Sequence, residues 1–162
     1  MKLQIKKTTN LFGEIKVSGS KNASLPILVV PLLTNETVYL QNVPNILDVE
    51  YMIELLKLCG VRVKRNEQTN EVVLKRRKVK SVIKSPYLNQ IRASYYLMGA
   101  LFTEKRLIKT KIPGGCDFEK RPINYHLEAF KQMGGNVIVN NDDIYISIKG
   151  EKFDESIKQI KL

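Results

Sequence analysis

A cysteine that follows two glycines, in the sequence PGGC at residues 113–116, has the surroundings of a reactive thiol. Consecutive glycines make the backbone permissive. Lys111 and Lys120 lie near Cys116 in sequence, and a helix is expected to start at Pro122. Nearby cations and a helix N-terminus both lower the pKa of a thiol. Cys116 is therefore a candidate nucleophile or acid, and a buried or idle cysteine is the alternative.

The remaining cysteine and the single histidine do not have such surroundings. Cys59 ends a predicted apolar helix and is expected to be buried. Two cysteines are too few for a disulfide framework, and the expected setting is the reducing cytoplasm. His126 has no second histidine and no thiol pair beside it, so no metal site is expected. The alternative to a functional role for His126 is a structural hydrogen bond.

Two predicted helix starts carry side chains that suit an anion. The sequence SGSKN at residues 18–22 places Lys21 and Asn22 in the first turn of a helix, after a glycine. Backbone N–H groups and the helix dipole favour negative charge there. The spacing of a Walker loop is absent. Arg92 takes the position of Asn22 in the repeat described below. The alternative for residues 18–22 is an ordinary capped helix, and the alternative for Arg92 is a solvated surface arginine.

A third set of candidates lies in the sequence RPINYH at residues 121–126. Arg121 comes just before a helix that begins with proline, and a guanidinium in that position can form a forked contact with phosphate. Asn124 can form hydrogen bonds with an amide or a base edge. These residue types again indicate a negatively charged ligand that carries a polar group.

An internal repeat must position these residues. Ala-Ser recurs at residues 23–24 and 93–94, a spacing of 70 residues. Each copy predicts a helix, a strand, a second helix that is stopped by glycine, and a hairpin. The predicted elements are 21–33, 37–40, 49–58, 62–64 and 71–74 in the first copy, and 92–102, 107–110, 123–133, 136–139 and 144–148 in the second. A lead-in strand is expected at 14–17.

The first helix of the repeat is the least regular prediction. Pro26 and Pro31 would normally interrupt a helix, and the apolar sequence between them also fits a buried strand. The better helix-forming sequence of residues 92–102 in the second copy favours a helix, with Ser20 as its cap.

Composition limits the protein class. The chain has 162 residues, 43% of them hydrophobic, which is enough for one ordinary domain with a mostly aliphatic core. No apolar run is long enough for a membrane helix, and residues 1–10 do not resemble a secretory signal. The net charge of +11 favours anionic partners. The basic stretch at residues 75–84 has no interleaved aromatic residue, so a solvated linker is a better interpretation than a nucleic-acid site.

The motifs SGSKNA, IRAS, PGGC and RP with His126 occur in the order and at the separations of a known family. Over residues 1–150, the chain resembles UDP-N-acetylglucosamine 1-carboxyvinyltransferase of the enolpyruvyl transferase family. The resemblance implies an α/β (α+β) fold of repeated βαβαββ units arranged as inside-out barrels. Two units are present here. Residues 1–20 would be lead-in strands of the family's other domain, 21–150 a two-unit partial domain, and 151–162 a tail or the start of a further element.

The resemblance also implies an activity. The family transfers the enolpyruvyl group of phosphoenolpyruvate to the 3-hydroxyl of UDP-N-acetylglucosamine, the first step of peptidoglycan synthesis, through a tetrahedral intermediate. It uses no metal or organic cofactor. Cys116 matches the family's proton donor, which is also the target of fosfomycin. Lys21 and Asn22 match contacts to phosphoenolpyruvate or the intermediate, with Lys21 in the catalytic set. Arg92 and Arg121 match positions that contact the substrates. The uridine-nucleotide contact of the family is matched by Pro122, Ile123, Asn124 and Tyr125.

Several features depart from the family pattern. Asn124 stands where the family usually has Asp, Tyr125 where it often has a non-aromatic residue, and Tyr96 where a Trp is often found. The resemblance implies two domains of three units each, and only two of these six units are present. The chain alone is therefore expected to show little or no turnover without a complementing polypeptide. A truncated, non-catalytic module that binds a nucleotide sugar or a partner is the main alternative. A basic nucleic-acid-binding domain and a relative acting on shikimate phosphate are less favoured.

Overall fold

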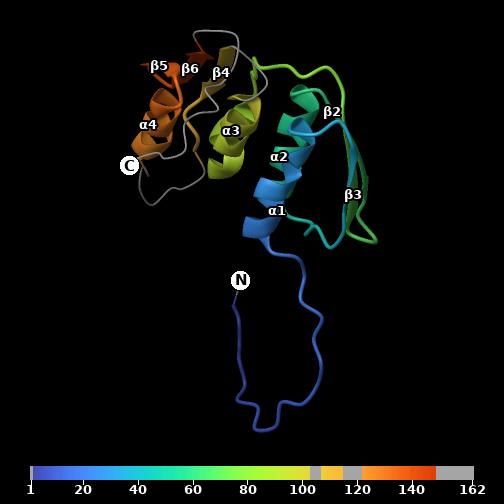
Figure 1. Ribbon diagram of the computed structural model, residues 1–162. Helices are drawn as coiled ribbons and strands as arrows, with labels where there is room; N and C mark the ends of the chain where they lie inside the picture. The colour runs from blue at the N-terminus through green and yellow to red at the C-terminus, as the bar shows by residue number, and fades with distance from the viewer. Residues whose placement is uncertain (1, 103–106, 115–121, 149–162) are drawn as a thin grey trace.

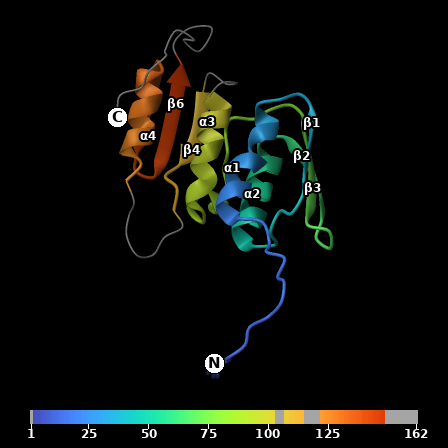
Figure 2. The same ribbon diagram turned by 60° about the horizontal axis from the view of Figure 1, so that its bottom comes forward.

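The computed structural model describes residues 2–102, 107–114 and 122–148, which form two similar units (Figure 1). The first unit spans residues 21–76 and the second spans residues 81–148. In both views the sheet of the first unit lies at one side, its helices lie beside it, and α3 lies between those helices and β4 (Figures 1 and 2).

The first unit contains two α-helices and one antiparallel sheet. Its elements are α1 (Lys21–Leu28), the 3-10 helix η1 (Val30–Leu32), β1 (Thr37–Leu40), α2 (Leu47–Leu58), β2 (Val61–Asn66) and β3 (Glu71–Arg76). The strand order is β1-β3-β2, with Thr37 opposite Lys75 and Val61 opposite Arg76. Asn70 closes the hairpin in the left-handed region, at φ 55°, which asparagine tolerates better than most residues.

The second unit repeats this topology, which confirms the predicted repeat and fold class. Its elements are η2 (Pro86–Asn89), η3 (Arg92–Tyr95), α3 (Tyr96–Phe102), β4 (Leu107–Lys111), α4 (Asn124–Gln132), β5 (Gly135–Asn140) and β6 (Asp143–Ile148). The order β4-β6-β5 places the last strand in the middle, as in the first unit. A parallel bridge between Val82 and Lys109 adds the linker to the free edge of β4.

The two prolines shape the first helix. Ser20 caps α1 as predicted, because its hydroxyl oxygen accepts a hydrogen bond from the Ala23 N–H at 3.4 Å. Pro26 is tolerated inside α1, but the α-helix ends at Leu28 and the chain continues as η1 around Pro31. Proline lacks an N–H and its ring clashes with the preceding turn, which accounts for the change to a tighter helix. Residues 21–33 are therefore helical as predicted, but they do not form one continuous helix.

Two predictions about the secondary structure were wrong. Residues 14–17 form no strand, and the side chains of Ile15 and Val17 are 87% and 77% exposed. A strand needs a neighbour that satisfies its backbone groups, and no described strand lies beside this segment. The basic stretch at residues 75–84 is not all linker, because Lys75 and Arg76 belong to β3. Both side chains donate hydrogen bonds to Asn35 in the turn after η1. The Nζ of Lys75 donates to the carbonyl of Asn35 at 2.6 Å.

The core is aliphatic, as the composition predicts. It lies between the helices and the inner faces of the two sheets and continues from one unit into the other. Its largest fully buried side chains are Leu28, Leu32, Met52, Leu55, Leu56, Leu74, Leu88, Leu97, Met98, Leu101, Ile108 and Ile144. Truncation of one such leucine to alanine in a packed core costs about 2–5 kcal/mol of folding stability.

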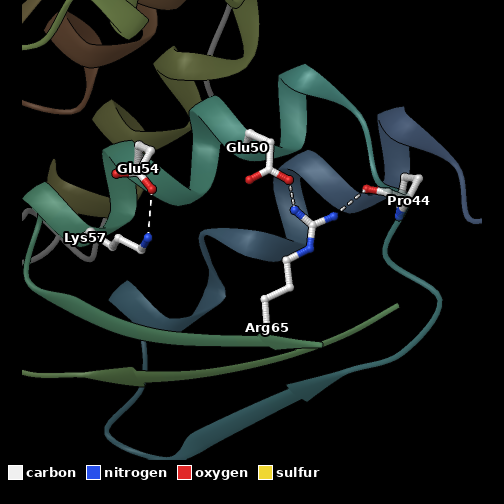
Figure 3. Close-up of polar contacts among 5 residues, drawn as sticks. All are labelled: Pro44, Glu50, Glu54, Lys57 and Arg65. Carbon is white, nitrogen blue, oxygen red and sulfur yellow. Dashed lines mark hydrogen bonds and ion pairs between the residues drawn. The ribbon is translucent and has the colours of Figure 1, made fainter. Parts of the chain in front are cut away.

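An arginine connects the hairpin of the first unit to α2 (Figure 3). The Arg65 side chain is 10% exposed and forms an ion pair with Glu50 on α2. Its other terminal nitrogen donates a hydrogen bond to the carbonyl of Pro44 at 3.2 Å. Lys57 and Glu54, drawn in the same view, form an exposed pair one turn apart. Arg65 therefore fixes the segment before α2 relative to β2.

Candidate functional site

The helices that carry the predicted site residues begin at the same end of the molecule. α1, α2, α4 and the η3–α3 pair all start at the lower end in Figures 1 and 2. Each helix start presents unsatisfied N–H groups and the positive end of a dipole. Lys21 and Asn22 lie at the start of α1, Arg92 lies in η3, and Asn124 and Tyr125 open α4.

The loop before α1 is held in place by the segment before α2. The backbone N–H of Gly19 donates to the side-chain oxygen of Asn42 at 3.1 Å. A Cβ atom at Gly19 would lie 1.8 Å from the carbonyl oxygen of Asn42, so only glycine permits this approach. Asn42 itself adopts the left-handed conformation, at φ 57°. This contact fixes the start of α1 and therefore the direction in which Lys21 leaves the helix.

Lys21 is accessible and has one acidic neighbour. Its Nζ lies 3.3 Å from Oδ1 of Asp48 in the first turn of α2, and its side chain is 50% exposed. The pair contributes little stability, because both groups are well solvated. The neighbouring Asn22 is exposed as well. Both side chains are therefore available to an anion that approaches the start of α1.

Arg92 connects the start of the second repeat to the start of α4. One of its terminal nitrogens donates a hydrogen bond to the carbonyl of Pro122 at 3.0 Å. Its guanidinium carbon lies 5.6 Å from the centre of the Tyr95 ring. The structure thus brings together Arg92 and the predicted nucleotide segment, which are 30 residues apart in sequence.

His126 packs into the same cluster as a neutral ring. Its ring centre lies 4.3 Å from that of Tyr95. Burial lowers the pKa of His126, and the positive charge of Arg92 lowers it further. Within the described part of the chain, its buried Nδ1 has no hydrogen-bond partner, so the predicted structural hydrogen bond is not found at this atom. Among the same residues, no cluster of His, Cys, Asp and Glu could hold a metal ion.

The residues around the start of α4 divide into exposed and buried positions. Pro122 and Asn124 are exposed, and Tyr125 is 65% exposed. Ile123 is only 7% exposed and belongs to the core, so any ligand contact at this position would involve its backbone. α4 begins at Asn124, one residue after the start of the predicted range 123–133 and two residues after the start expected at Pro122.

Cys116 and Arg121 lie outside the described residues. The base of their segment is described up to Gly114, where a Cβ atom would lie 1.9 Å from the carbonyl oxygen of Asn89. A glycine is required at this close approach of two backbones. Cys59 is buried as predicted, and burial raises the pKa of its thiol to about 12. Cys59 is therefore protonated near neutral pH and shielded from reagents.

Several residues that build this site were not predicted. Asp48 had a sequence signal, because it is an acidic residue in the first turn of a helix. Asn42, Asn89 and Tyr95 had none, because their partners lie far along the chain. Together these residues position two cationic side chains at helix starts, an arrangement that suits phosphate or carboxylate groups.

Comparison with known proteins shows the family to which the chain belongs. The model of the EPSP synthase (3-phosphoshikimate 1-carboxyvinyltransferase) family matches residues 5–162. The chain belongs to the enolpyruvyl transferase family. It is 37% identical over 143 residues to UDP-N-acetylglucosamine 1-carboxyvinyltransferase of Elusimicrobium minutum (strain Pei191), covering 88% of this chain and 34% of that enzyme. The enzyme of the same name from Buchnera aphidicola subsp. Baizongia pistaciae (strain Bp) is 39% identical over 140 residues, covering 86% of this chain and 33% of that enzyme.

Solved structures of this family share the fold. The enolpyruvyl transferase NikO from Streptomyces tendae superposes with a TM-score of 0.72 at 14% identity, covering 86% of this chain and 30% of NikO. EPSP synthase from Acinetobacter baumannii gives 0.64 at 16% identity, covering 83% of this chain and 32% of that chain. The chain spans about a third of the length of the curated relatives that it matches. Among the described residues, no helix is long and apolar enough to cross a membrane.

Proposed function

We propose that this chain forms one part of the active site of a cytoplasmic carboxyvinyltransferase. The substrates are phosphoenolpyruvate and UDP-N-acetylglucosamine, and the reaction is the first step of peptidoglycan synthesis. The similarity to enzymes named UDP-N-acetylglucosamine 1-carboxyvinyltransferase, at 37% identity over 88% of this chain, is the observation that carries the proposal. The retained sequences SGSKN and PGGC support it.

The proposed roles follow from the chemistry of each group. Lys21 and Asn22 contact the phosphate or carboxylate of phosphoenolpyruvate, because both are accessible at a helix start. Arg92 contributes a second positive charge, fixed by the carbonyl of Pro122. Arg121 binds on the phosphate side, and Pro122, Ile123, Asn124 and Tyr125 contact the uridine nucleotide. Cys116 donates a proton to the methylene carbon of phosphoenolpyruvate while the 3-hydroxyl of UDP-N-acetylglucosamine adds to the neighbouring carbon and loses its own proton to a base, which gives the tetrahedral intermediate.

We further propose that a complementing polypeptide is needed for turnover. Transfer between two substrates needs groups on both sides of them, held in register. The described helix starts supply one side only, and the chain spans about a third of its relatives. Residues 2–20 extend away from the two units and carry exposed apolar side chains, among them Leu3, Ile5, Ile15 and Val17 (Figure 1), so this segment is available for contact with a further part of the enzyme.

Covalent labelling by fosfomycin tests the proposed site. The epoxide of fosfomycin alkylates a thiolate, and the adduct is detected by intact-mass measurement in the presence of UDP-N-acetylglucosamine. We expect a single adduct that is lost in Cys116→Ser and retained in Cys59→Ser, because the Cys59 thiol is buried and protonated. Binding of UDP-N-acetylglucosamine without any adduct would favour a non-catalytic binding module. An adduct that survives in Cys116→Ser would contradict the assignment.

A further inference from the structure

A pocket of about 730 Å³ lies between the linker that enters the second unit and strand β4. This volume is typical of small-molecule sites. Lys21, Asn22, Arg92 and the described residues 122–125 do not line it, and of the described residues that support the transferase site, Asn89 does. Its lining residues are Ile83, Lys84, Ser85, Pro86, Asn89, Gln90, Lys109, Thr110, Lys111 and Asp143. We call it the lysine pocket.

The wall of the lysine pocket is held by backbone contacts. The N–H of Ile83 donates to the carbonyl of Lys109 at 3.1 Å, and the N–H of Lys109 donates to the carbonyl of Ser81 at 3.0 Å. The hydroxyl oxygen of Ser85 accepts a hydrogen bond from the N–H of Tyr87 at 3.2 Å, which fixes the start of η2. Asn89 is held against Gly114 on the other side. The pocket is therefore preformed, which reduces the cost of ordering it around a ligand.

Positive charge is in excess in the lysine pocket. Lys84, Lys109 and Lys111 line it against a single acid, Asp143. Lys109 and Lys111 are two residues apart on β4, so their side chains leave the same face of the sheet. Lys84 and Lys111 are exposed, and neither forms an ion pair with a described residue.

Lys109 is held in a fixed position in this wall. Its Nζ donates a hydrogen bond to the Tyr145 hydroxyl at 2.8 Å and lies 3.5 Å from Oδ2 of Asp143. It also lies 4.7 Å from the centre of the Tyr145 ring. The hydrogen bond with Tyr145 raises the pKa of Lys109, so the group stays positively charged at neutral and mildly alkaline pH.

We propose that the lysine pocket binds a small phosphorylated compound at a site separate from Lys21 and Arg92. Three ammonium groups on one concave surface suit the charge of a phosphate or diphosphate, since lysine acts as a point charge with three donors. Ser85, Asn89 and Gln90 also line the pocket and carry polar side chains. The concave shape and limited volume favour a small molecule over a nucleic acid strand. This inference does not depend on the proposed transferase activity.

Amide NMR with inorganic pyrophosphate tests this site directly. Uniformly ¹⁵N-labelled full chain is titrated at constant ionic strength, and the backbone amides of Ser85, Gln90 and Lys111 are followed. We expect saturable shifts at these amides. In the double variant Lys84→Gln/Lys111→Gln, we expect pyrophosphate to bind roughly tenfold more weakly at these amides. The matched control Lys6→Gln/Lys64→Gln removes two exposed charges elsewhere and should bind as the unmodified chain does.

Three results would overturn the lysine pocket as a binding site. One is the absence of saturable shifts at the three amides, and another is equal weakening by the control variant. The third is loss of these shifts in Arg92→Gln alone, which would mean that pyrophosphate acts through the transferase site. Fosfomycin labelling of Cys116 is measured separately on Lys84→Gln/Lys111→Gln. Labelling retained in that variant is the result expected if the two sites are separate. Labelling of the unmodified chain without any pyrophosphate shifts would reject the pocket and leave the transferase proposal standing.

Discussion

Replacing Gly114 with alanine tests whether the base of the PGGC segment is fixed against η2. The added Cβ would lie 1.9 Å from the carbonyl oxygen of Asn89, whereas real Cβ contacts below 3.0 Å essentially do not occur. One of the two backbones must therefore move by more than 1 Å. Overpacking of this kind costs about 1–3 kcal/mol. A displacement of about 1 Å at a reacting group can also slow a reaction by about a hundredfold.

Urea unfolding and the rate of fosfomycin labelling measure these two effects. We expect Gly114→Ala to lower the free energy of unfolding by about 1–3 kcal/mol and to slow labelling of Cys116 by at least about tenfold. Gly99→Ala is the matched control, because no described atom outside the backbone of its own helix lies within 4 Å of its added Cβ. Alanine within α3 should raise stability by about 0.5–1 kcal/mol. Stability and labelling of Gly114→Ala equal to those of the unmodified chain would refute the close approach.

Three further predictions concern described groups outside the PGGC segment. Arg65→Met should lower the free energy of unfolding by about 1–3 kcal/mol in urea titrations, since it removes the contacts with Glu50 and Pro44; an unchanged midpoint would contradict this. The pKa of His126 is lowered in the folded chain, so the unfolded chain binds more protons and stability should fall as pH drops through the ordinary value of 6.5. His126→Gln should flatten that dependence as the pH falls below 6.5, and an equally steep fall would exclude His126 as its source. Cys59 should stay unreactive toward a thiol reagent in the folded Cys116→Ser variant at pH 8 and react on unfolding, and rapid native labelling would show that its burial is wrong.

The repeat made most of the fold predictable. The matched order of motifs predicted the two sheets and the four α-helices that the described residues form, because each copy supports the interpretation of the other. The exact helix ends were less predictable. Competition between proline geometry and helix formation at Pro31 changes the hydrogen-bonding pattern, and sequence alone does not show which pattern will result. The strand expected at residues 14–17 failed for another reason, because its alternating pattern needs a partner strand.

The charged residues of the candidate site were predictable from the sequence, but the residues that hold them in place were not. Lys21 and Arg92 could be found because cations at helix starts have a local sequence signal. The contact of Arg92 with the Pro122 carbonyl joins segments 30 residues apart, and no local pattern records it. The same holds for Asn42 at Gly19 and for Asn89 at Gly114. The lysine pocket was also missed, since Lys84 was interpreted as part of a solvated linker.

Phosphate release from phosphoenolpyruvate most directly tests the claim that this chain is one part of a carboxyvinyltransferase. Release is measured with UDP-N-acetylglucosamine present, first for the chain alone and then with a polypeptide from the same organism that supplies the remaining units. We predict little or no release by the chain alone, and release by the mixture that is abolished by Cys116→Ser. A full rate from the chain alone would contradict the need for a partner, and release by the mixture that is unaffected by Cys116→Ser would contradict the assigned chemistry.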